Sequence, residues 1–345
     1  MSVTIDITGL PEERLLFAPS PLAELNAVLH ERRDGQERRE RGERRERGND
    51  GNSGRPEHVR PVMTDDAPEI LRYAAFSNRP EGGNPAGVVL DATGLTAERM
   101  LAVAAEVGYS ETAFLTPGSE QGAYHVRYFS PLLEVPFCGH ATVAAAVAVA
   151  GRSGPGRYVF STAAGDVPVE VEPGDDGLRA TLTSVEPKVE EVPAVDVEEA
   201  LALLGWSAAD LDPALPPRIG YAGARHLVLA AGTRSRLARL DYDFDGLAAF
   251  MNARDLVTLQ LVWREAPEVF HVRDPFPVGG VVEDPATGAA AAAFGAYLRE
   301  LGAVTAPAVL TLHQGEDLGR PGVLRVELRA EDTRVRVSGT AVAIP

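Results

Sequence analysis

Two stretches of the chain combine a glycine-containing turn with a run of alanines. They lie at 137–151 (FCGHATVAAAVAVAG) and 284–302 (DPATGAAAAAFGAYLRELG). Alanine is the strongest helix former and its small side chain lets other backbone pack close, so each stretch predicts a helix. We expect the second over about 285–300, with Asp284 as N-cap and Pro285 in the first position. A capped core helix is the simpler explanation of this stretch alone, but its free first-turn N–H groups also suit an anion.

The remaining apolar pattern predicts a repeated order of elements. The folded body begins near residue 69 with strands at LRYAAF and GNPAGVVLD. A helix capped by Thr96 and stopped at Gly108 follows, then two strands and the first alanine-rich helix, which stops at Gly151. The second half repeats this order. We therefore predict an α/β protein of two similar domains, each a curved sheet around a small-residue helix, with both turns facing a cleft.

The first 66 residues differ from this body. Residues 31–47 carry eight Arg and six acidic side chains and no apolar residue, so we interpret 31–66 as a disordered charged linker. The preceding segment, VTIDITGLPEERLLFAPSPLAELNAVLH, resembles the opening of ArsR-type winged-helix regulators, and we call 1–30 a regulator-like segment. It stops before any helix-turn-helix, so it predicts no DNA-binding function.

Charge and cysteine content narrow the partners and the location. The net charge is −17, which disfavours nucleic acid and anionic membranes as partners. No apolar run reaches the ~18 residues that a membrane helix needs. The N-terminus has acidic residues where a signal peptide has basic ones, and the single Cys138 cannot form an intrachain disulfide. We expect a cytoplasmic protein.

Glu111 is the first candidate for chemistry, because it opens the apolar strand SETAFLTP. It shares a face with Ala113 and Leu115, so we expect it to be partly buried. A buried carboxylate is costly unless it is paired or protonated, and a carboxyl group poised between these states serves as a general acid or base. Pairing with an arginine such as Arg127 explains the same pattern equally well.

Other candidates lie beside the first alanine-rich helix. His140 could donate to a substrate or could cap the helix. Cys138 follows Pro136 and Phe137, which suggests a buried thiol. We expect no metal, since the histidines show no HxxxH or HxH spacing and there is no second cysteine. Dinucleotide-binding, P-loop and GxSxG signatures are also absent from the sequence.

Four stretches in this order and spacing resemble the PhzF-like family of phenazine-biosynthesis isomerases: AAFSNRPEGGNPAGVV, SETAFLTP, VRYFSPLLEVPFCGHATVAAA and GGVVEDPATGAAAAAFGAYL. The resemblance covers about 69–345. It implies the diaminopimelate-epimerase-like fold, with one domain over 67–185 plus about 335–345, a second over 186–334, and the active site between them. It also implies a homodimer and no cofactor.

Carried over by motif, the resemblance implies that Glu111 is the acid–base carboxylate and that His140 and Asp284 assist it. It further implies substrate-binding positions on the turns and on the GNPAG loop: Asn84, Gly139, Thr142, Thr287, Gly288 and Ala289. The best-studied family members have Ser where this chain has Ala289. That change removes a hydroxyl from the helix start and puts the phenazine substrate in doubt.

Together these observations predict a cofactor-independent isomerase that moves a proton between carbons of a small, carboxylate-bearing metabolite. A racemase with two thiol bases is excluded, because it needs two cysteines. The alternative is a non-catalytic small-molecule-binding or regulatory protein that uses the same cleft.

Overall fold

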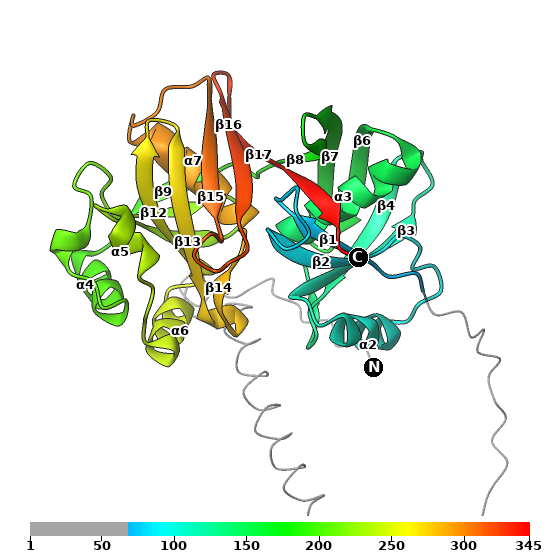
Figure 1. Cartoon of the computed structure of the whole chain (residues 1–345), viewed down its shortest axis with the longest axis horizontal. Helices are drawn as coiled ribbons and strands as arrows, with labels where there is room; N and C mark the ends of the chain where they lie inside the picture. The colour runs from blue at the N-terminus through cyan, green and yellow to red at the C-terminus, as the bar shows by residue number, and fades with distance from the viewer. Residues whose placement is uncertain (1–67) are drawn as a thin grey trace, which may run out of the picture. The chain divides into compact units, whose positions relative to one another are not determined.

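The computed structural model describes residues 68–345 (Figure 1). The regulator-like segment 1–30, the predicted linker 31–66 and residue 67 lie outside the described residues. Of the described residues, 68–251 and 256–345 belong to one compact unit. This unit contains both alanine-rich helices.

The first half of the described chain alternates strands with two helices. Its elements in chain order are β1 (Leu71–Ala75), β2 (Asn84–Val89), α2 (Ala97–Val107), β3 (Glu111–Pro117), β4 (Ala123–Phe129), β5 (Glu134–Val135), α3 (Gly139–Ser153), β6 (Gly156–Thr162), β7 (Gly165–Gly174) and β8 (Gly177–Thr183).

The second half repeats this order with a few additional elements. It contains β9 (Lys188–Glu191), α4 (Ala194–Leu203), β10 (Arg218–Tyr221), β11 (Arg225–Ala230), α5 (Arg234–Ala238), α6 (Phe244–Ala253), β12 (Thr258–Ala266), β13 (Val269–Phe276), β14 (Val281–Asp284), α7 (Gly288–Glu300), β15 (Ala308–Gln314), β16 (Gly322–Arg329) and β17 (Asp332–Ala343). Short 3₁₀ turns lie at Ala208–Asp210 and Pro277–Gly279.

Strand pairing shows that the two halves are built alike. β1, β2, β3, β4, β6, β7 and β8 pair in that order, parallel at β2–β3 and β4–β6 and antiparallel elsewhere. β10, β11, β12, β13, β15, β16 and β17 pair with the same alternation, parallel at β11–β12 and β13–β15. This match confirms the predicted fold class, two similar α/β halves.

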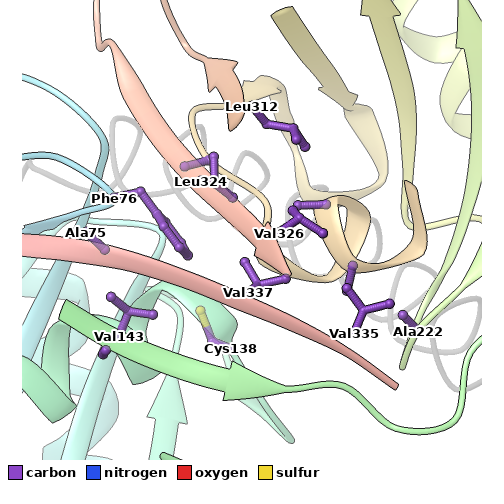
Figure 2. Packing of buried hydrophobic residues seen from close by; sticks show 14 of the residues in the cluster. Ala75, Phe76, Cys138, Val143, Ala222, Leu312, Leu324, Val326, Val335 and Val337 are labelled. Carbon is purple, nitrogen blue, oxygen red and sulfur yellow. The ribbon is translucent and has the colours of Figure 1, made fainter. Parts of the chain in front are cut away.

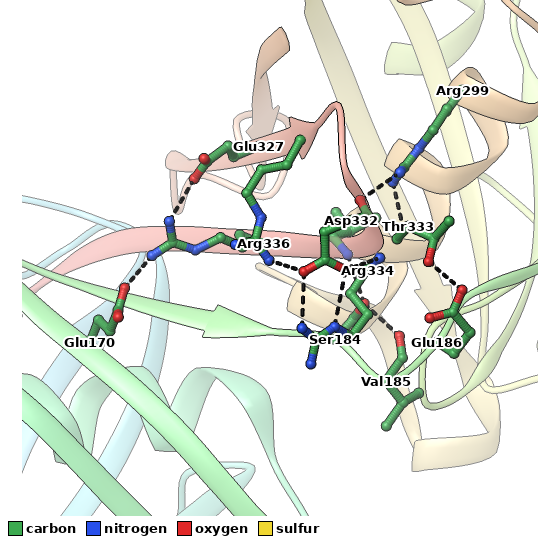
Figure 3. Close-up of polar contacts among 12 residues, drawn as sticks. Glu170, Ser184, Val185, Glu186, Arg299, Glu327, Asp332, Thr333, Arg334 and Arg336 are labelled. Carbon is green, nitrogen blue, oxygen red and sulfur yellow. Dashed lines mark hydrogen bonds and ion pairs between the residues drawn. The ribbon is translucent and has the colours of Figure 1, made fainter. Parts of the chain in front are cut away.

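β17 joins the two halves. It pairs with β16 through Ser338 and with β8 through Thr340, and its last residues pair with β1. The strands of the first half therefore form a closed ring, β1–β2–β3–β4–β6–β7–β8–β17–β1. Figure 3 shows the polar contacts around this strand, where Arg336 pairs with Glu170 of β7 and with Glu327 of β16.

The two alanine-rich helices pack against the strands of their own halves. α3 packs on β1, β2, β8 and β17, and every residue from His140 to Ala150 is buried. α7 packs on β10, β16 and β17, and every residue from Ala290 to Leu298 is buried. Small side chains allow these close contacts, and at Gly295 an added Cβ would come within 2.6 Å of Val326.

Phe76 fills the core between β1 and β17, as Figure 2 shows. Its ring takes the space beside Gly339, where an added Cβ would lie 2.3 Å from the ring. The residue itself adopts a left-handed backbone with φ of 63°. Such a conformation is uncommon for a bulky side chain, so packing must hold it in place.

Two helix boundaries differ from the predictions. The helix predicted over 285–300 begins at Gly288 with Thr287 as N-cap, so the assignment of Asp284 as N-cap is wrong. Asp284 instead ends β14, where it pairs with Asp274 of β13. The first alanine-rich helix continues past Gly151 to Ser153, because Gly154 provides the positive φ that ends it. The predicted boundaries of α2, Thr96 and Gly108, are confirmed.

Candidate active site

Glu111 lies at the first position of β3, beside Ala86 of β2. Its side chain is 18% exposed, while Ala113 and Leu115 on the same face are fully buried. Arg127 does not pair with it, because that guanidinium forms a bidentate ion pair with Glu134 (2.6 and 2.7 Å). The carboxylate is therefore left to face the start of α3.

Three side chains meet at that helix start. The Cys138 thiol donates to Glu111 Oε2 over 3.5 Å, and His140 Nε2 lies 3.4 Å from the same oxygen. Cys138 Sγ is 3.4 Å from His140 Nδ1. Burial raises the pKa of Cys138 well above its ordinary value, and the charge of Glu111 raises it further. The thiol is therefore neutral, and Cys138 is buried as predicted.

Asp284 forms the opposite side of the site. Its Oδ1 accepts from the amide of Asn84 (2.8 Å) and its Oδ2 from the hydroxyl of Thr287 (2.5 Å). Burial raises the pKa of Asp284, the electrostatic interaction with His140 lowers it, and the interaction with Glu111 raises it again. The hydrogen bond from Asn84 joins β14 to β2, and β2 pairs with β3, whose Glu111 contacts His140 of α3. Residues of these four elements therefore form one site.

A layer of polar groups beneath Asp284 was not predicted from the sequence. Gln314, the last residue of β15, donates to the Asp284 carbonyl (3.0 Å) and accepts from the Thr287 N–H (3.1 Å). It also donates to Asp274, a fully buried carboxyl whose pKa is raised well above its ordinary value, mainly by burial. Gln314 and Asp274 are polar residues in largely buried strands. This is the same sequence pattern that singled out Glu111.

Both central helices leave their first-turn N–H groups without a side-chain cap in the described structure. Neither Cys138 before Gly139 nor Thr287 before Gly288 makes a capping hydrogen bond. Gly288 and Ala289 are half-buried, so the start of α7 is accessible. Such helix ends attract anions.

Thr142 is placed differently from the other predicted binding residues. It is fully buried, its hydroxyl donates to the Cys138 carbonyl (2.6 Å), and it shares a 2.7 Å hydrogen bond with the Tyr128 hydroxyl. Its N–H also bonds to Cys138. These contacts anchor the first turn of α3, while a direct role in binding substrate stays a prediction.

The loop before Asn84 is held by backbone contacts. Gly83 has φ of 54°, and a Cβ there would lie 2.1 Å from the Ala75 carbonyl oxygen. Arg320 donates to the carbonyls of Gly82 and Gly83 (2.8 and 2.9 Å). The GRPG stretch at 319–322 thus fixes the loop that presents Asn84.

The arrangement defines a class of enzyme: two curved α/β halves, each with a central helix, and a carboxylate, an imidazole and a thiol at one helix start. A crystal structure of a PhzF-family phenazine biosynthesis protein from Bacillus anthracis is similar, with a TM-score of 0.72 and 26% identity over 80% of this chain and 96% of that one. A probable proline racemase from Agrobacterium radiobacter, at 12% identity and a TM-score of 0.53, shares the fold alone; it covers 79% of this chain and 90% of that one. The diaminopimelate-epimerase-like fold is confirmed.

This chain belongs to the phenazine biosynthesis-like protein family (PhzC-PhzF), whose profile matches residues 73–345. It is 33% identical over 296 residues to the uncharacterized isomerase YddE of Escherichia coli O157:H7, covering 80% of this chain and 96% of that one. It is 31% identical over 274 residues to the trans-2,3-dihydro-3-hydroxyanthranilate isomerase of Pseudomonas chlororaphis, covering 78% and 94%. The predicted class, an isomerase, is confirmed.

Residues 1–35 match a second profile, a family of unknown function (DUF5937). Among the described residues, no helix is long and apolar enough to cross a membrane. The expected cytoplasmic location, the homodimer, the domain boundaries and the absence of nucleic-acid partners stay predictions.

Proposed function

We propose that this protein is a cofactor-independent isomerase that moves a proton between two carbons of a small carboxylate-bearing metabolite, with Glu111 as the acid–base group. The observation that carries the proposal is the position of Glu111. Its carboxylate is partly exposed and has a thiol and an imidazole, but no arginine, as its described partners. Such a group can accept a proton and return it.

His140 and Asp284 assist in this proposal. His140 contacts Glu111 through Nε2 and is buried, so it can orient the carboxylate or stabilise its charged form. Burial raises the pKa of Asp284, so this carboxyl accepts a proton more readily than an exposed aspartate and can take part in the proton transfer. Asn84 and Thr287 fix its two oxygens.

The substrate's carboxylate group would bind at the uncapped starts of α3 and α7, near Gly139 and Gly288. The Pseudomonas relative is named for a carboxylate substrate, an anthranilate derivative. Ala289 supplies no hydroxyl at the start of α7, so a substrate that needs a hydrogen bond from that position is disfavoured.

Proton exchange in deuterated water tests the role of Glu111. Wild-type protein would be incubated with trans-2,3-dihydro-3-hydroxyanthranilate and with a panel of related small carboxylates. General acid–base catalysis contributes roughly 100- to 10,000-fold, so Glu111→Gln should lose at least that lower factor in turnover of any active compound. The measurement is deuterium incorporation or product formation by NMR.

The matched control is Glu120→Gln, which removes the same charge from an exposed turn and should retain full turnover. Near-normal turnover by Glu111→Gln on a compound that wild type converts would reject Glu111 as the proton carrier.

A further inference from the structure

Glu111, Cys138 and His140 also have the donor types and spacing of a metal site. We propose that these three side chains bind a thiophilic divalent cation of the Zn²⁺ class, and that the bound cation blocks proton transfer by Glu111. The binding half of this proposal stands alone, whereas the blocking half rests on the proposed function.

The interatomic distances match the coordination of zinc. Glu111 Oε2 lies 3.4 Å from His140 Nε2 and 3.5 Å from Cys138 Sγ, and Cys138 Sγ lies 3.8 Å from His140 Nε2. The centre of a triangle with these sides is about 2.1 Å from each corner, close to the zinc–oxygen, zinc–nitrogen and zinc–sulfur bond lengths of about 2.0–2.3 Å. A small displacement from the plane satisfies all three bonds and leaves a fourth position open.

Charge supports the same assignment. A carboxylate, a thiolate and a neutral imidazole carry two negative charges together, which a divalent cation neutralises in a largely buried site. Cys138 is neutral before binding, so its S–H bond breaks, the proton leaves to solvent, and the sulfur lone pair binds the cation. Sulfur and imidazole ligands favour zinc over magnesium and calcium, which prefer oxygen.

The cluster is distinctive within the described part of the chain. Between residues 68 and 345, no other group of three His, Cys, Asp or Glu side chains brings its ligand atoms within 4.8 Å of one another. Ser110 Oγ contacts His140 Nε2 at 3.3 Å and would give up this contact, which its exposed position allows.

A bound cation would occupy the proposed acid–base group, Glu111, and the imidazole of His140 beside it. It would take the Glu111 oxygen that faces His140, so the carboxylate could no longer accept a proton from carbon. From the sequence we expect no metal, because the histidines lack HxxxH or HxH spacing and there is no second cysteine, so this proposal departs from that expectation. Spacing along the chain does not indicate such a site, since Glu111 comes from a strand 27 residues before Cys138.

Cobalt and zinc titrations test the binding half on the intact chain. Metal-free protein is titrated with Co²⁺, and Zn²⁺ affinity is measured by competition with a chromophoric chelator. We expect one cation per chain and a thiolate-to-cobalt charge-transfer band in the near ultraviolet. Cys138→Ser should abolish the band and weaken Zn²⁺ binding at least ~100-fold, because it removes one of three ligands.

His140→Gln provides a second variant should Cys138→Ser disturb folding, and it should weaken binding similarly. His125→Gln is its matched control, since His125 is exposed on β4 and outside the cluster, and it should bind as wild type does. Wild-type protein without a thiolate band, or equal Zn²⁺ affinity in wild type and in both ligand variants, would overturn the site.

The exchange assay separates this proposal from the proposed function. With any compound that wild type converts, stoichiometric Zn²⁺ should stop exchange and a chelator should restore it. If Glu111→Gln keeps its turnover and wild-type protein shows the thiolate-to-cobalt band, the proposed role of Glu111 is rejected and the metal site is supported. If Glu111→Gln is inactive but wild-type protein forms no thiolate-to-cobalt band, the role of Glu111 is supported and the metal site is rejected.

Discussion

Asp274 is a fully buried carboxyl group held by amides. Gln314 donates to it at 3.3 Å, and Gln260, with its amide nitrogen turned toward the carboxyl, donates to both oxygens at 2.6 and 3.0 Å. Two further acids, Asp284 and Glu283, raise its pKa in addition to the larger effect of burial. The nearby Arg273 is engaged by Glu283. The ionised form of Asp274 is therefore disfavoured in the folded protein, although hydrogen bonds from Thr287 and Gln314 partly offset the effect of burial.

This environment makes stability depend on pH. A carboxyl whose folded pKa is raised contributes stability that is fully present below its unfolded pKa and is lost as pH rises through the folded pKa. Asp274→Asn keeps the shape and cannot ionise, so we expect the variant to gain unfolding free energy relative to wild type at pH 8 and less at pH 4. The difference should be on the order of 1 kcal/mol or more.

Urea unfolding at the two pH values measures this effect. Asp176→Asn, at an exposed turn, is the matched control and should leave the pH dependence unchanged. An Asp274→Asn variant that is destabilised equally at both pH values would contradict a raised pKa of Asp274.

At this scale the sequence indicates some of the site and misses the rest. An acid at the start of an apolar strand singles out Glu111, and Asp274 is likewise an acid within a largely apolar strand, VFHVRDPF. The contacts of Cys138 and Gln314 depend on strands and helices far apart in the chain. No local pattern reports them.

At the scale of elements, the first turn of α3 positions Cys138 and His140 in the site. Thr142 ties this turn to Cys138 and to Tyr128 of β4, and both Thr142 and Tyr128 are fully buried. Thr142→Val keeps the shape but leaves the Tyr128 hydroxyl without this partner. Burying an unsatisfied group costs about 1–3 kcal/mol, so we expect a loss of unfolding free energy in that range.

A double-mutant cycle with Tyr128→Phe isolates the hydrogen bond. The double variant should lose less stability than the sum of the single variants, because both polar partners are then replaced by apolar groups. Chemical denaturation of the four proteins provides the measurement, and strictly additive losses would argue against this anchor.

The elements themselves were largely predictable. Capping residues located α2 to the residue, because Thr96 and Gly108 act through local backbone contacts. The start of α7 was not predictable in this way, since Asp284 bonds to Asn84, 200 residues earlier in the chain. Local helix propensity does not report a partner so distant in the chain. With Asp284 bonded to Asn84, the N-cap position is taken by Thr287.

For the whole molecule, the repeated order of elements predicts the two similar halves, but it does not predict how β17 pairs with β8 and β1. Arg336 lies where β17 pairs with both β8 and β16, with Glu170 of β7 on one side and Glu327 of β16 on the other (Figure 3). Its side chain is 22% exposed, so its ion pairs are partly shielded from solvent.

Arg336→Met tests this junction, since it keeps the apolar stem and removes the charge. We expect a loss of about 1 kcal/mol in unfolding free energy at low salt, and a smaller loss in 1 M salt because the ion pairs are screened. Arg157→Met is the control, since Arg157 pairs with the same Glu170 but is 87% exposed and should change stability little. Equal effects of the two variants, measured by urea unfolding, would refute a special role for Arg336.

The closing of the ring by β17 has a consequence for how the chain is made. β17 follows every other strand of the body, yet β1 at the beginning of that body and β8 more than a hundred residues later both pair with it. A ribosome releases β1 long before it completes β17, so both strands keep an unpaired edge throughout synthesis. Premature termination before Asp332 would leave those edges permanently open and would damage both halves at once, although it removes residues from only one end.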